Sequence, residues 1–371
     1  MKNLKTLSTY ASEFITRTLV NIERGVRHTD RIHGPSGIGK TAIIKQIVER
    51  LTEITGNEWG FATINVANHG AWDLIGVPNI VEGKTTFAAP EFLPDLSKPG
   101  TPAFGIFFVD EIDKAEGDMV NAMMPLINEG KLGSYTIPEG WLIIGAGNRL
   151  ADSAGSRVVP NVANARRAID VGIYACPDEL VEYAAKSDWH PMVSAFLKFQ
   201  PQLVHEFPNG IESKKAKTIT GFACPATWEI TSDFLHYDFK PEVLQGYLAD
   251  GVLSEGVAIQ FCNFLKVVNQ IPNFGSIFRG ERPEVAANKP DIKWALISNL
   301  AYKVSANLHF SDTQTLDDAW SNAVSYCHEV LGPEFGATFV RLATAKNPEL
   351  METAVYRDYK DNNQDLFLTN R

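Results

Sequence analysis

The chain has 371 residues, of which 44% are hydrophobic and 21% charged, and its formal net charge is −10 at pH 7. This composition is ordinary for a soluble globular protein of two domains, and the acidic balance disfavours non-specific binding to nucleic acid or to an anionic membrane. The sequence shows no apolar signal segment or membrane span, and its cysteines lie too far apart for a zinc site or a disulfide framework, which fits a cytoplasmic protein: Cys176, Cys224, Cys262 and Cys327.

The first predicted elements surround a glycine-rich turn. Loosely helical spacing of apolar residues predicts a helix over 3–26, and a second apolar-periodic run predicts a helix that begins after Lys40. Between them, "RIHGPSGIGKTA" (31–42) fits the pattern G-x-x-x-x-G-K-[ST]. The residues just before it, "RHTDRIH", are too polar for an ordinary buried strand. They predict a strand that is short or lies at the limit of the sheet.

The turn has the chemistry of a triphosphate-binding loop. Its glycines let backbone N–H groups converge on phosphate oxygens, while Lys40 reaches the outer phosphates and Thr41 offers a hydroxyl to Mg²⁺. The positive end of the following helix faces the anion. The alternative is a chance glycine-rich turn that caps a helix. We expect ATP to be held by Gly34, Pro35, Ser36, Gly37, Ile38, Gly39, Lys40, Thr41 and Ala42.

Two continuously apolar runs, 104–111 and 141–148, are typical of central parallel strands buried on both faces. A helix over 115–132 and a turn or hairpin over 133–140 separate them. Strands that alternate with helices predict an α/β fold with a central parallel sheet, whose ligands lie at the carboxyl ends of the strands.

Ahead of these runs, residues 59–68 are strand-like and include Asn65 and Asn68. Residues 69–100 are rich in glycine and proline and exceed what a connection requires. We expect this stretch to be irregular and functional.

The run 104–111 ends in Asp110 and Glu111. At this position Asp110 can hold the Mg²⁺ shell opposite Thr41, while Glu111 orients a water for in-line attack on the terminal phosphate. Two carboxylates with these two roles predict hydrolysis rather than binding alone. The alternative is a solvated acidic turn, "DEID", after a strand.

Two further sites follow in the chain. Asn148, at the end of the run 141–148, can hydrogen-bond the attacking water and the terminal phosphate, although a plain strand-ending asparagine is the alternative. Arg166 and Arg167 precede another apolar strand. They can project to the nucleotide of a neighbouring subunit, or form a solvated face. From about residue 175 onward the pattern changes, and the segments predict helices.

The order of these landmarks resembles the AAA+ ATPases. The segments "FFVDEIDKA", "GSYTIPEGWLIIGAGNR" and "PNVANARR" look like the MoxR-type branch, which includes the ATPase subunit of cobaltochelatase and AAA ATPases of bacteria and phages. The resemblance runs from about residue 30 to about residue 270. It implies a P-loop AAA+ core over 29–175 after an N-terminal helical segment (1–28), an all-helical lid over 176–275 and a C-terminal helical extension over 276–371.

The resemblance also implies roles for single residues. Lys40 and Thr41 match the Walker A pair, Asp110 and Glu111 the Walker B pair, Asn148 sensor one, and Arg166 or Arg167 the arginine finger. In the lid, the family commonly has an arginine where this chain has Ala226. Either Lys214, Lys215 or Lys217 substitutes for it, or the lid responds to nucleotide without that contact.

The sequence therefore predicts a cytoplasmic MoxR-like AAA+ ATPase that uses ATP and Mg²⁺ to remodel a protein partner. The resemblance implies a ring, usually a hexamer, and a client that in this branch often contains a von Willebrand A domain. Two alternatives remain open. One is a nucleic-acid motor or loader of the same fold, which the acidic charge disfavours; the other is a non-catalytic scaffold gated by nucleotide, which the Asp110–Glu111 pair disfavours.

Overall fold

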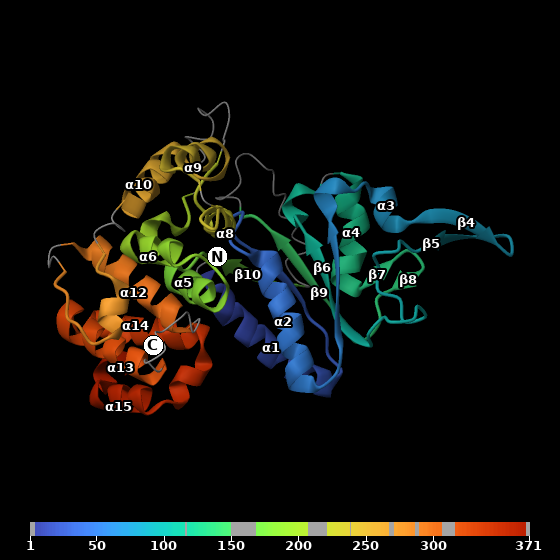
Figure 1. Cartoon of the computed structure of the whole chain (residues 1–371). Coiled ribbons are helices and arrows are strands. Elements are labelled where there is room, and N and C mark those ends of the chain that lie inside the picture. The colour runs from blue at the N-terminus through green and yellow to red at the C-terminus, as the bar shows by residue number, and fades with distance from the viewer. Residues whose placement is uncertain are drawn as a thin grey trace. The chain divides into compact units, whose positions relative to one another are not determined.

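The chain forms two compact units, the first ending at Ala175 and the second beginning at Cys176. The computed structural model describes residues 4–115, 117–149, 168–206, 221–237, 239–266, 271–285, 289–305 and 316–368. The predicted fold class is confirmed: the first unit holds a parallel sheet between helices, and the second is helical (Figure 1). The further division of the chain at residues 28 and 275 stays a prediction.

A six-stranded sheet forms the centre of the first unit, in the order β1-β10-β2-β9-β6-β3. Every neighbouring pair in it is parallel. Because the strands share one direction, their carboxyl ends meet at one edge of the sheet. The strands are β1 (Leu4–Lys5), β2 (Thr29–His33), β3 (Trp59–Asn65), β6 (Phe104–Asp110), β9 (Trp141–Gly147) and β10 (Ala168–Ile173).

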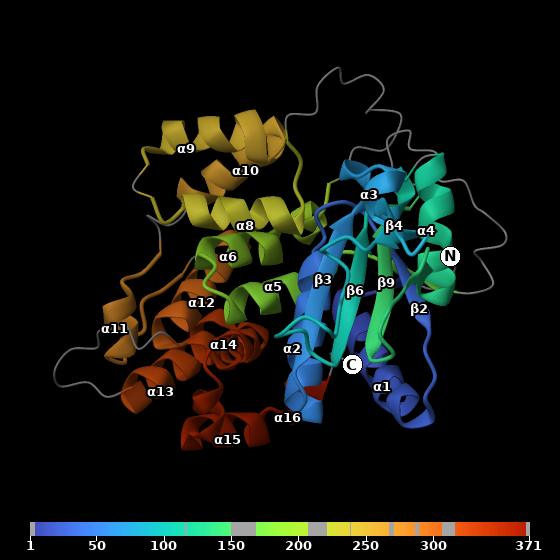
Figure 2. The same cartoon turned by 90° about the vertical axis from the view of Figure 1, so that its right-hand side faces the viewer.

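Helices cover both faces of this sheet, which explains why β6 reads as one apolar run (Figure 2). Ile106 and Phe108 pack into a core with α1 (Leu7–Arg24) and α2 (Lys40–Thr55). Phe107 and Val109, which point to the opposite face, pack into a second core with α3 (Ala71–Ile75) and α4 (Asp118–Glu129). Alternate residues of a strand face opposite sides of the sheet, so burial on both faces requires apolar residues at every position.

The polar strand β2 is short, as one of the two predicted alternatives has it, but it lies inside the sheet between β10 and β9. The expectation that it lies at the limit of the sheet is wrong. Its charged residues are paired: Asp30 is fully buried and accepts from Arg17 at 2.6 Å, while Arg31 and His33 contact Asp170 at 2.7 and 3.0 Å. Ion pairs and hydrogen bonds offset the desolvation that otherwise keeps such residues out of a central strand.

The expectation that residues 69–100 are irregular is wrong in part. They include α3 and an antiparallel hairpin of β4 (Val77–Val81) and β5 (Lys84–Ala88), which extends away from the sheet in Figure 1. Its two turn residues, Glu82 and Gly83, both have positive φ, as a tight hairpin turn requires. The second hairpin, β7 (Lys131–Leu132) with β8 (Tyr135–Thr136), confirms a hairpin in this region, but it begins within 115–132, where the sequence predicts a helix; α4 ends at Glu129.

The second unit is built from helices, as the sequence predicts. Several begin with proline at the first position, where its missing N–H and fixed φ suit a helix start. The helices are α5 (Pro177–Lys186), α6 (Pro191–Phe199), α8 (Pro225–Phe234), α9 (Pro241–Tyr247), α10 (Glu255–Leu265), α11 (Phe274–Phe278), α12 (Pro290–Ser305), α13 (Leu316–Tyr326), α14 (Pro333–Lys346), α15 (Ala354–Asn362) and α16 (Gln364–Leu368).

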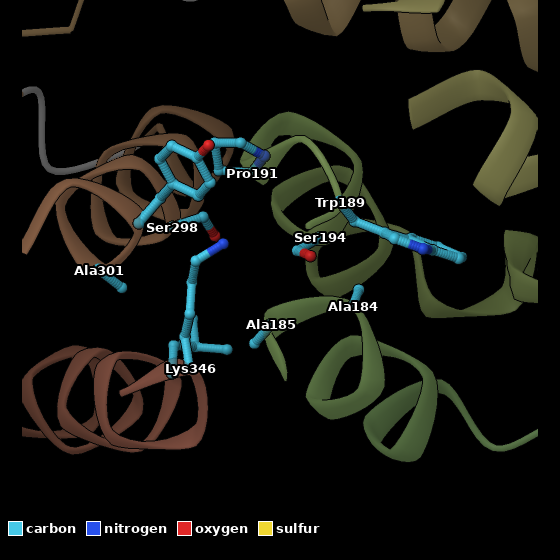
Figure 3. A pocket seen from close by; sticks show the side chains of 10 residues that line it. Ala184, Ala185, Trp189, Pro191, Ser194, Ser298, Ala301 and Lys346 are labelled. Atoms are coloured by element: carbon cyan, nitrogen blue, oxygen red, sulfur yellow. The ribbon is translucent and has the colours of Figure 1, made fainter. Parts of the chain in front are cut away.

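A small cavity of about 20 Å³ lies among α5, α6, α12 and α14 (Figure 3). The buried hydroxyl of Ser298 lines it and has no hydrogen-bond partner in the described part of the chain. A cavity of this size holds about one water molecule. It is too small for an organic ligand. In the described ranges no helix is both long and apolar enough to cross a bilayer.

Candidate active site

The glycine-rich turn joins the carboxyl end of β2 to the start of α2. Gly37 and Gly39 have φ of 75° and 96°, which side chains other than glycine's rarely allow. Gly34 is required for a different reason: a Cβ there would lie 2.7 Å from Ile38 Cδ1 and 2.9 Å from the Ile173 carbonyl oxygen. The loop therefore has the tight path that lets backbone N–H groups turn toward an anion at the start of α2.

Lys40 connects this loop to the end of β9. Its Nζ donates to the carbonyl oxygens of Gly34 and Pro35 at 2.8 and 2.9 Å, and to Asn148 Oδ1 at 3.3 Å. The Gly34 N–H also donates to the Gly147 carbonyl at 3.1 Å. The structure thus places Lys40 beside Asn148, two residues that are more than a hundred positions apart in the sequence.

Thr41 and Asp110 form the pair that can hold a cation. Thr41 Oγ1 donates to Asp110 Oδ2 at 3.3 Å, and Asp110 Oδ1 accepts the N–H of Glu111 at 2.8 Å. Burial raises the pKa of Asp110, against the opposing effects of that N–H and of the charge of Lys40. A hydroxyl and a carboxylate are oxygen ligands of the kind that Mg²⁺ takes, and this ion usually completes its shell with water and phosphate oxygens. The residues present therefore fit a Mg²⁺–triphosphate complex.

Glu111 is held in an unusual backbone conformation. Its φ of 56° and ψ of 37° lie in the left-handed region, and only Glu82 shares a positive φ among the non-glycine residues that the structure describes. Strained positions of this kind cluster at functional sites. Burial acts to raise the pKa of the Glu111 carboxyl, but hydrogen bonds from Lys114 and Asn65 and the charges of Lys114 and Lys40 lower it overall. Glu111 is therefore a carboxylate, as the activation of a water requires.

Asn65 is a site residue whose role the sequence did not reveal. It ends β3 and lies opposite Asp110 in the parallel register, so its side chain reaches Glu111. Its Oδ1 also accepts the N–H of Ala67 at 3.0 Å. The signal was present in the sequence, because a polar residue at the end of the neighbouring strand must lie at the same edge as Asp110.

Asp113, the second aspartate of "DEID", is also more than part of a solvated turn. It is buried, and its Oδ1 accepts the backbone N–H of Asn148 at 2.9 Å. Gly147 makes this approach possible, since a Cβ at that position would lie 2.7 Å from Asp113 Oδ1. Asp113 therefore ties the turn after Glu111 to the end of β9. The sequence offered no signal for this contact beyond the acidic residue itself.

The structure does not place every predicted residue. Arg166 and Arg167, and likewise Lys214, Lys215 and Lys217, lie outside the described residues. Ala226 belongs to the second unit, where it is exposed in the first turn of α8. Within the loop, Pro35 and Ile38 are buried, while Ser36 and Ala42 are exposed.

Residues 32–157 match the family model described as "AAA domain (dynein-related subfamily)". The first unit carries an AAA+ domain. The match spans the glycine-rich turn, Asp110, Glu111 and Asn148. It ends before Arg166 and Arg167, so it says nothing of a finger or of the second unit.

Other known proteins are similar to parts of the chain. A stretch of 103 residues, 27% of this chain, is 29% identical to the chaperone protein ClpB of Mycoplasmoides gallisepticum and covers 13% of that protein. A mutant of Thermotoga maritima RuvB has a TM-score of 0.38 at 13% identity, over 86% of this chain and 91% of that one. The Aeropyrum pernix ORC2 protein, in ADPNP–ADP complexes, has a TM-score of 0.41 at 12% identity, over 98% of this chain and 96% of that one.

Proposed function

We propose that this protein is a MoxR-like AAA+ ATPase that hydrolyses ATP with Mg²⁺ in order to remodel or activate a protein partner. The observation that supports this best is the convergence of Lys40, Thr41, Asp110 and Asn148 at one edge of the sheet, with Glu111 directly beside them. A phosphate-binding loop alone would fit binding. The adjoining Glu111, whose lowered pKa keeps it ionised, adds the carboxylate that can orient a water.

Each of these residues has a task in hydrolysis. Lys40 leaves the loop carbonyls to neutralise the outer phosphates, and Thr41 with Asp110 holds Mg²⁺, which offsets the phosphate charge when bound. Glu111 orients a water in line with the terminal phosphate and accepts its proton. The Asn148 side chain hydrogen-bonds the terminal phosphate. The backbone N–H of Asn148 donates to Asp113, and this hydrogen bond couples the phosphate contact to the turn that follows Glu111.

A ring assembly is part of the proposal. In it, Arg166 or Arg167 reaches the nucleotide of the neighbouring subunit and stabilises charge in the transition state. A hexamer is the stoichiometry that the family resemblance implies.

A protein client is favoured over nucleic acid by two observations. The match to ClpB, named a chaperone, supports remodelling of proteins. The β4–β5 hairpin and the adjoining α3 also expose apolar side chains, with Ile80 at 77% and both Val77 and Trp72 at 71%. Exposed apolar groups gathered in one region are typical of surfaces that bind other proteins. A client with a von Willebrand A domain remains part of the proposal.

The first experiment measures nucleotide binding and steady-state ATPase activity. Lys40→Ala should lose nucleotide binding, whereas Glu111→Gln should bind ATP and lose turnover, because the amide keeps the shape but not the carboxylate. Lys45→Ala on the same helix is the matched control and should behave as the unaltered protein. Turnover that survives in Glu111→Gln would contradict the assigned role.

The second experiment tests the finger in trans. Arg166→Ala and Arg167→Ala should each be mixed with Lys40→Ala at concentrations where oligomers form. The variant that lacks the arginine finger should bind ATP but hydrolyse it about 10³ to 10⁵ times more slowly. Mixed rings should recover activity at interfaces that pair an intact loop with an intact finger. Full activity in a dilute monomer would contradict the ring mechanism, and stimulation by single-stranded DNA would favour a nucleic-acid motor.

A further inference from the structure

The second unit exposes a cluster of aromatic rings where α8 turns into α9. Phe234 stacks on Tyr247, with ring centroids 5.6 Å apart and an interplanar angle of 13°. Phe239 lies 5.4 Å from Tyr247 and 5.5 Å from Tyr237. We call this surface the aromatic face, which consists of Phe234, Tyr237, Phe239, Val243 and Tyr247.

The aromatic face is open to solvent. Tyr237 is 61% exposed, Tyr247 52% and Val243 45%, while Leu244, on the other side of α9, is buried. Val243 and Tyr247 are four residues apart on α9, so they lie side by side on one face of the helix. Single exposed apolar side chains are ordinary, but contiguous ones mark surfaces that bind a partner.

Two backbone hydrogen bonds link residues that carry the rings. The Tyr237 N–H donates to the Phe234 carbonyl at 3.3 Å, and the Phe239 N–H donates to the Tyr237 carbonyl at 2.9 Å. The rings also pack on one another, and this packing orders them before any partner arrives. Preorganised aromatic side chains lose little entropy on binding, which makes them effective contact residues.

Acidic side chains surround these rings. The stretch 225–250 contains five acidic residues and one lysine. Asp233, Glu242 and Asp250 are exposed, and each adjoins the aromatic face in sequence or within one helical turn. In the ranges that the structure describes, none of these carboxylates takes part in an ion pair. The surface thus combines exposed rings with unneutralised negative charge.

We propose that the aromatic face docks a cationic segment of a partner polypeptide in which arginine or lysine alternates with apolar residues. Guanidinium and ammonium groups are attracted to the faces of tyrosine rings, and their aliphatic stems pack on apolar side chains such as Val243. Asp233, Glu242 and Asp250 complement the positive charge and raise the association rate. The same carboxylates repel the phosphates of nucleic acid. This docking requires no nucleotide, so it goes beyond the proposed ATPase activity and is tested separately.

The experiment uses the full chain without nucleotide and a fluorescent twelve-residue peptide of alternating arginine and leucine, with binding followed by anisotropy. A peptide with glutamate in place of arginine, and one with serine in place of leucine, should each bind at least about tenfold more weakly. Affinity for the first peptide should fall as salt rises.

Variants then locate the site. Tyr237→Ala and Tyr247→Ala should each weaken binding about tenfold, as loss of a central contact residue does, whereas Tyr247→Phe keeps the ring and should stay within about twofold. The double variant Glu242→Lys, Asp250→Lys should also weaken binding. Tyr183→Ala, which removes another exposed tyrosine of the same unit, and Asp361→Lys on α15 are the matched controls and should leave affinity unchanged.

Three results would overturn the proposal. The first is equal binding of the arginine and glutamate peptides, and the second is unaltered affinity in a Tyr247→Ala protein that circular dichroism shows to be folded. The third is self-association of the chain, detected by sedimentation, that Tyr247→Ala abolishes; the occupant would then be a second copy. None of these results bears on the ATPase assays, so this proposal and the proposed function fail independently.

Discussion

The two strands on either side of β9, β2 and β6, both end at the candidate site, but different interactions stabilise them. β6 is apolar from Gly105 to Val109 and ends in Asp110, whereas β2 is polar at every position except Ile32 and leads into the phosphate loop. Burial on both faces stabilises β6. In β2, Asp30 pairs with Arg17, and Asp170 pairs with both Arg31 and His33. A central strand can therefore be polar when its charges find partners from other elements.

The difference shows what a strand contributes to its site. Hydrophobic burial is non-directional, so the side chains of Ile106 to Val109 in β6 contribute through packing rather than through specific polar contacts. Ion pairs and hydrogen bonds are directional, so β2 is fixed by three specific contacts immediately before Gly34. We expect the two strands to respond differently to truncation, to loss of a partner and to pH.

The largest effect is expected for truncation in β6. Phe108→Ala removes a fully buried ring from the core shared with α1 and α2, which should cost about 3 to 5 kcal/mol of unfolding free energy. Hydrogen exchange of the β6 amides measures this locally, without assuming that the two units unfold together. Phe108→Leu is the control and should cost less than about 1.5 kcal/mol. If Phe108→Ala lowers the free energy of unfolding by less than about 1.5 kcal/mol, neighbouring side chains of the core must fill the cavity.

Loss of a partner should have the next largest effect. Arg17→Ala leaves the carboxylate of Asp30, which is 0% exposed, without its bidentate cation, and we expect a cost of about 3 kcal/mol. Arg24→Ala, an exposed position on the same helix, is the control. The double variant Arg17→Met, Asp30→Leu should recover most of the loss, since an apolar pair of similar volume needs no charge partner. Equal stability of both single arginine variants would show that β2 does not depend on this pair.

The same comparison explains how much could be predicted from the sequence. The signals for β6, β9 and the phosphate loop are local, consisting of an apolar run or a spaced motif, and the structure confirms the parallel sheet that they predict. The position of β2 could not be predicted, because Asp170 is distant in sequence and no local pattern shows that it or Arg17, on the preceding helix, pairs with the strand. The β4–β5 hairpin was missed because its glycine and proline content suggested a loop.

For the candidate site, the sequence named Lys40, Thr41, Asp110 and Asn148, and the structure brings Lys40 within 3.3 Å of Asn148 and Thr41 within 3.3 Å of Asp110. Their roles in hydrolysis remain predictions. The roles of Asn65 and Asp113 became clear only in the fold, because Asn65 lies opposite Asp110 in the register of β3 with β6, and Asp113 accepts the N–H of Asn148 from the end of another strand. Local sequence patterns thus identify the groups that carry chemistry, while their supporting contacts require the tertiary structure.

A smaller effect is expected at the outer ion pair of β2. Arg31→Ala removes the contact with Asp170, whose side chain is 35% exposed, so water replaces much of what is lost. We expect a cost of about 1 kcal/mol or less, measured by hydrogen exchange of the β2 amides. A cost as large as that of Arg17→Ala would mean that exposure does not set the strength of these pairs.

The smallest effect concerns the pH dependence of this outer pair. Burial acts to raise the pKa of Asp170, but hydrogen bonds from His33 and Arg31 lower it overall from its ordinary value of 3.8. A carboxyl with a lowered pKa in the folded state contributes stability above its ordinary pKa, and that contribution disappears as the pH falls through the lowered value. The difference in unfolding free energy between the unaltered chain and Asp170→Asn should therefore shrink as the pH falls below about 4. Urea unfolding at a series of pH values measures it, with Glu58→Gln as a control that removes an exposed carboxylate of the same unit. A difference that grows as the pH falls would show that the pair with Arg31 and His33 does not stabilise the charged form of Asp170.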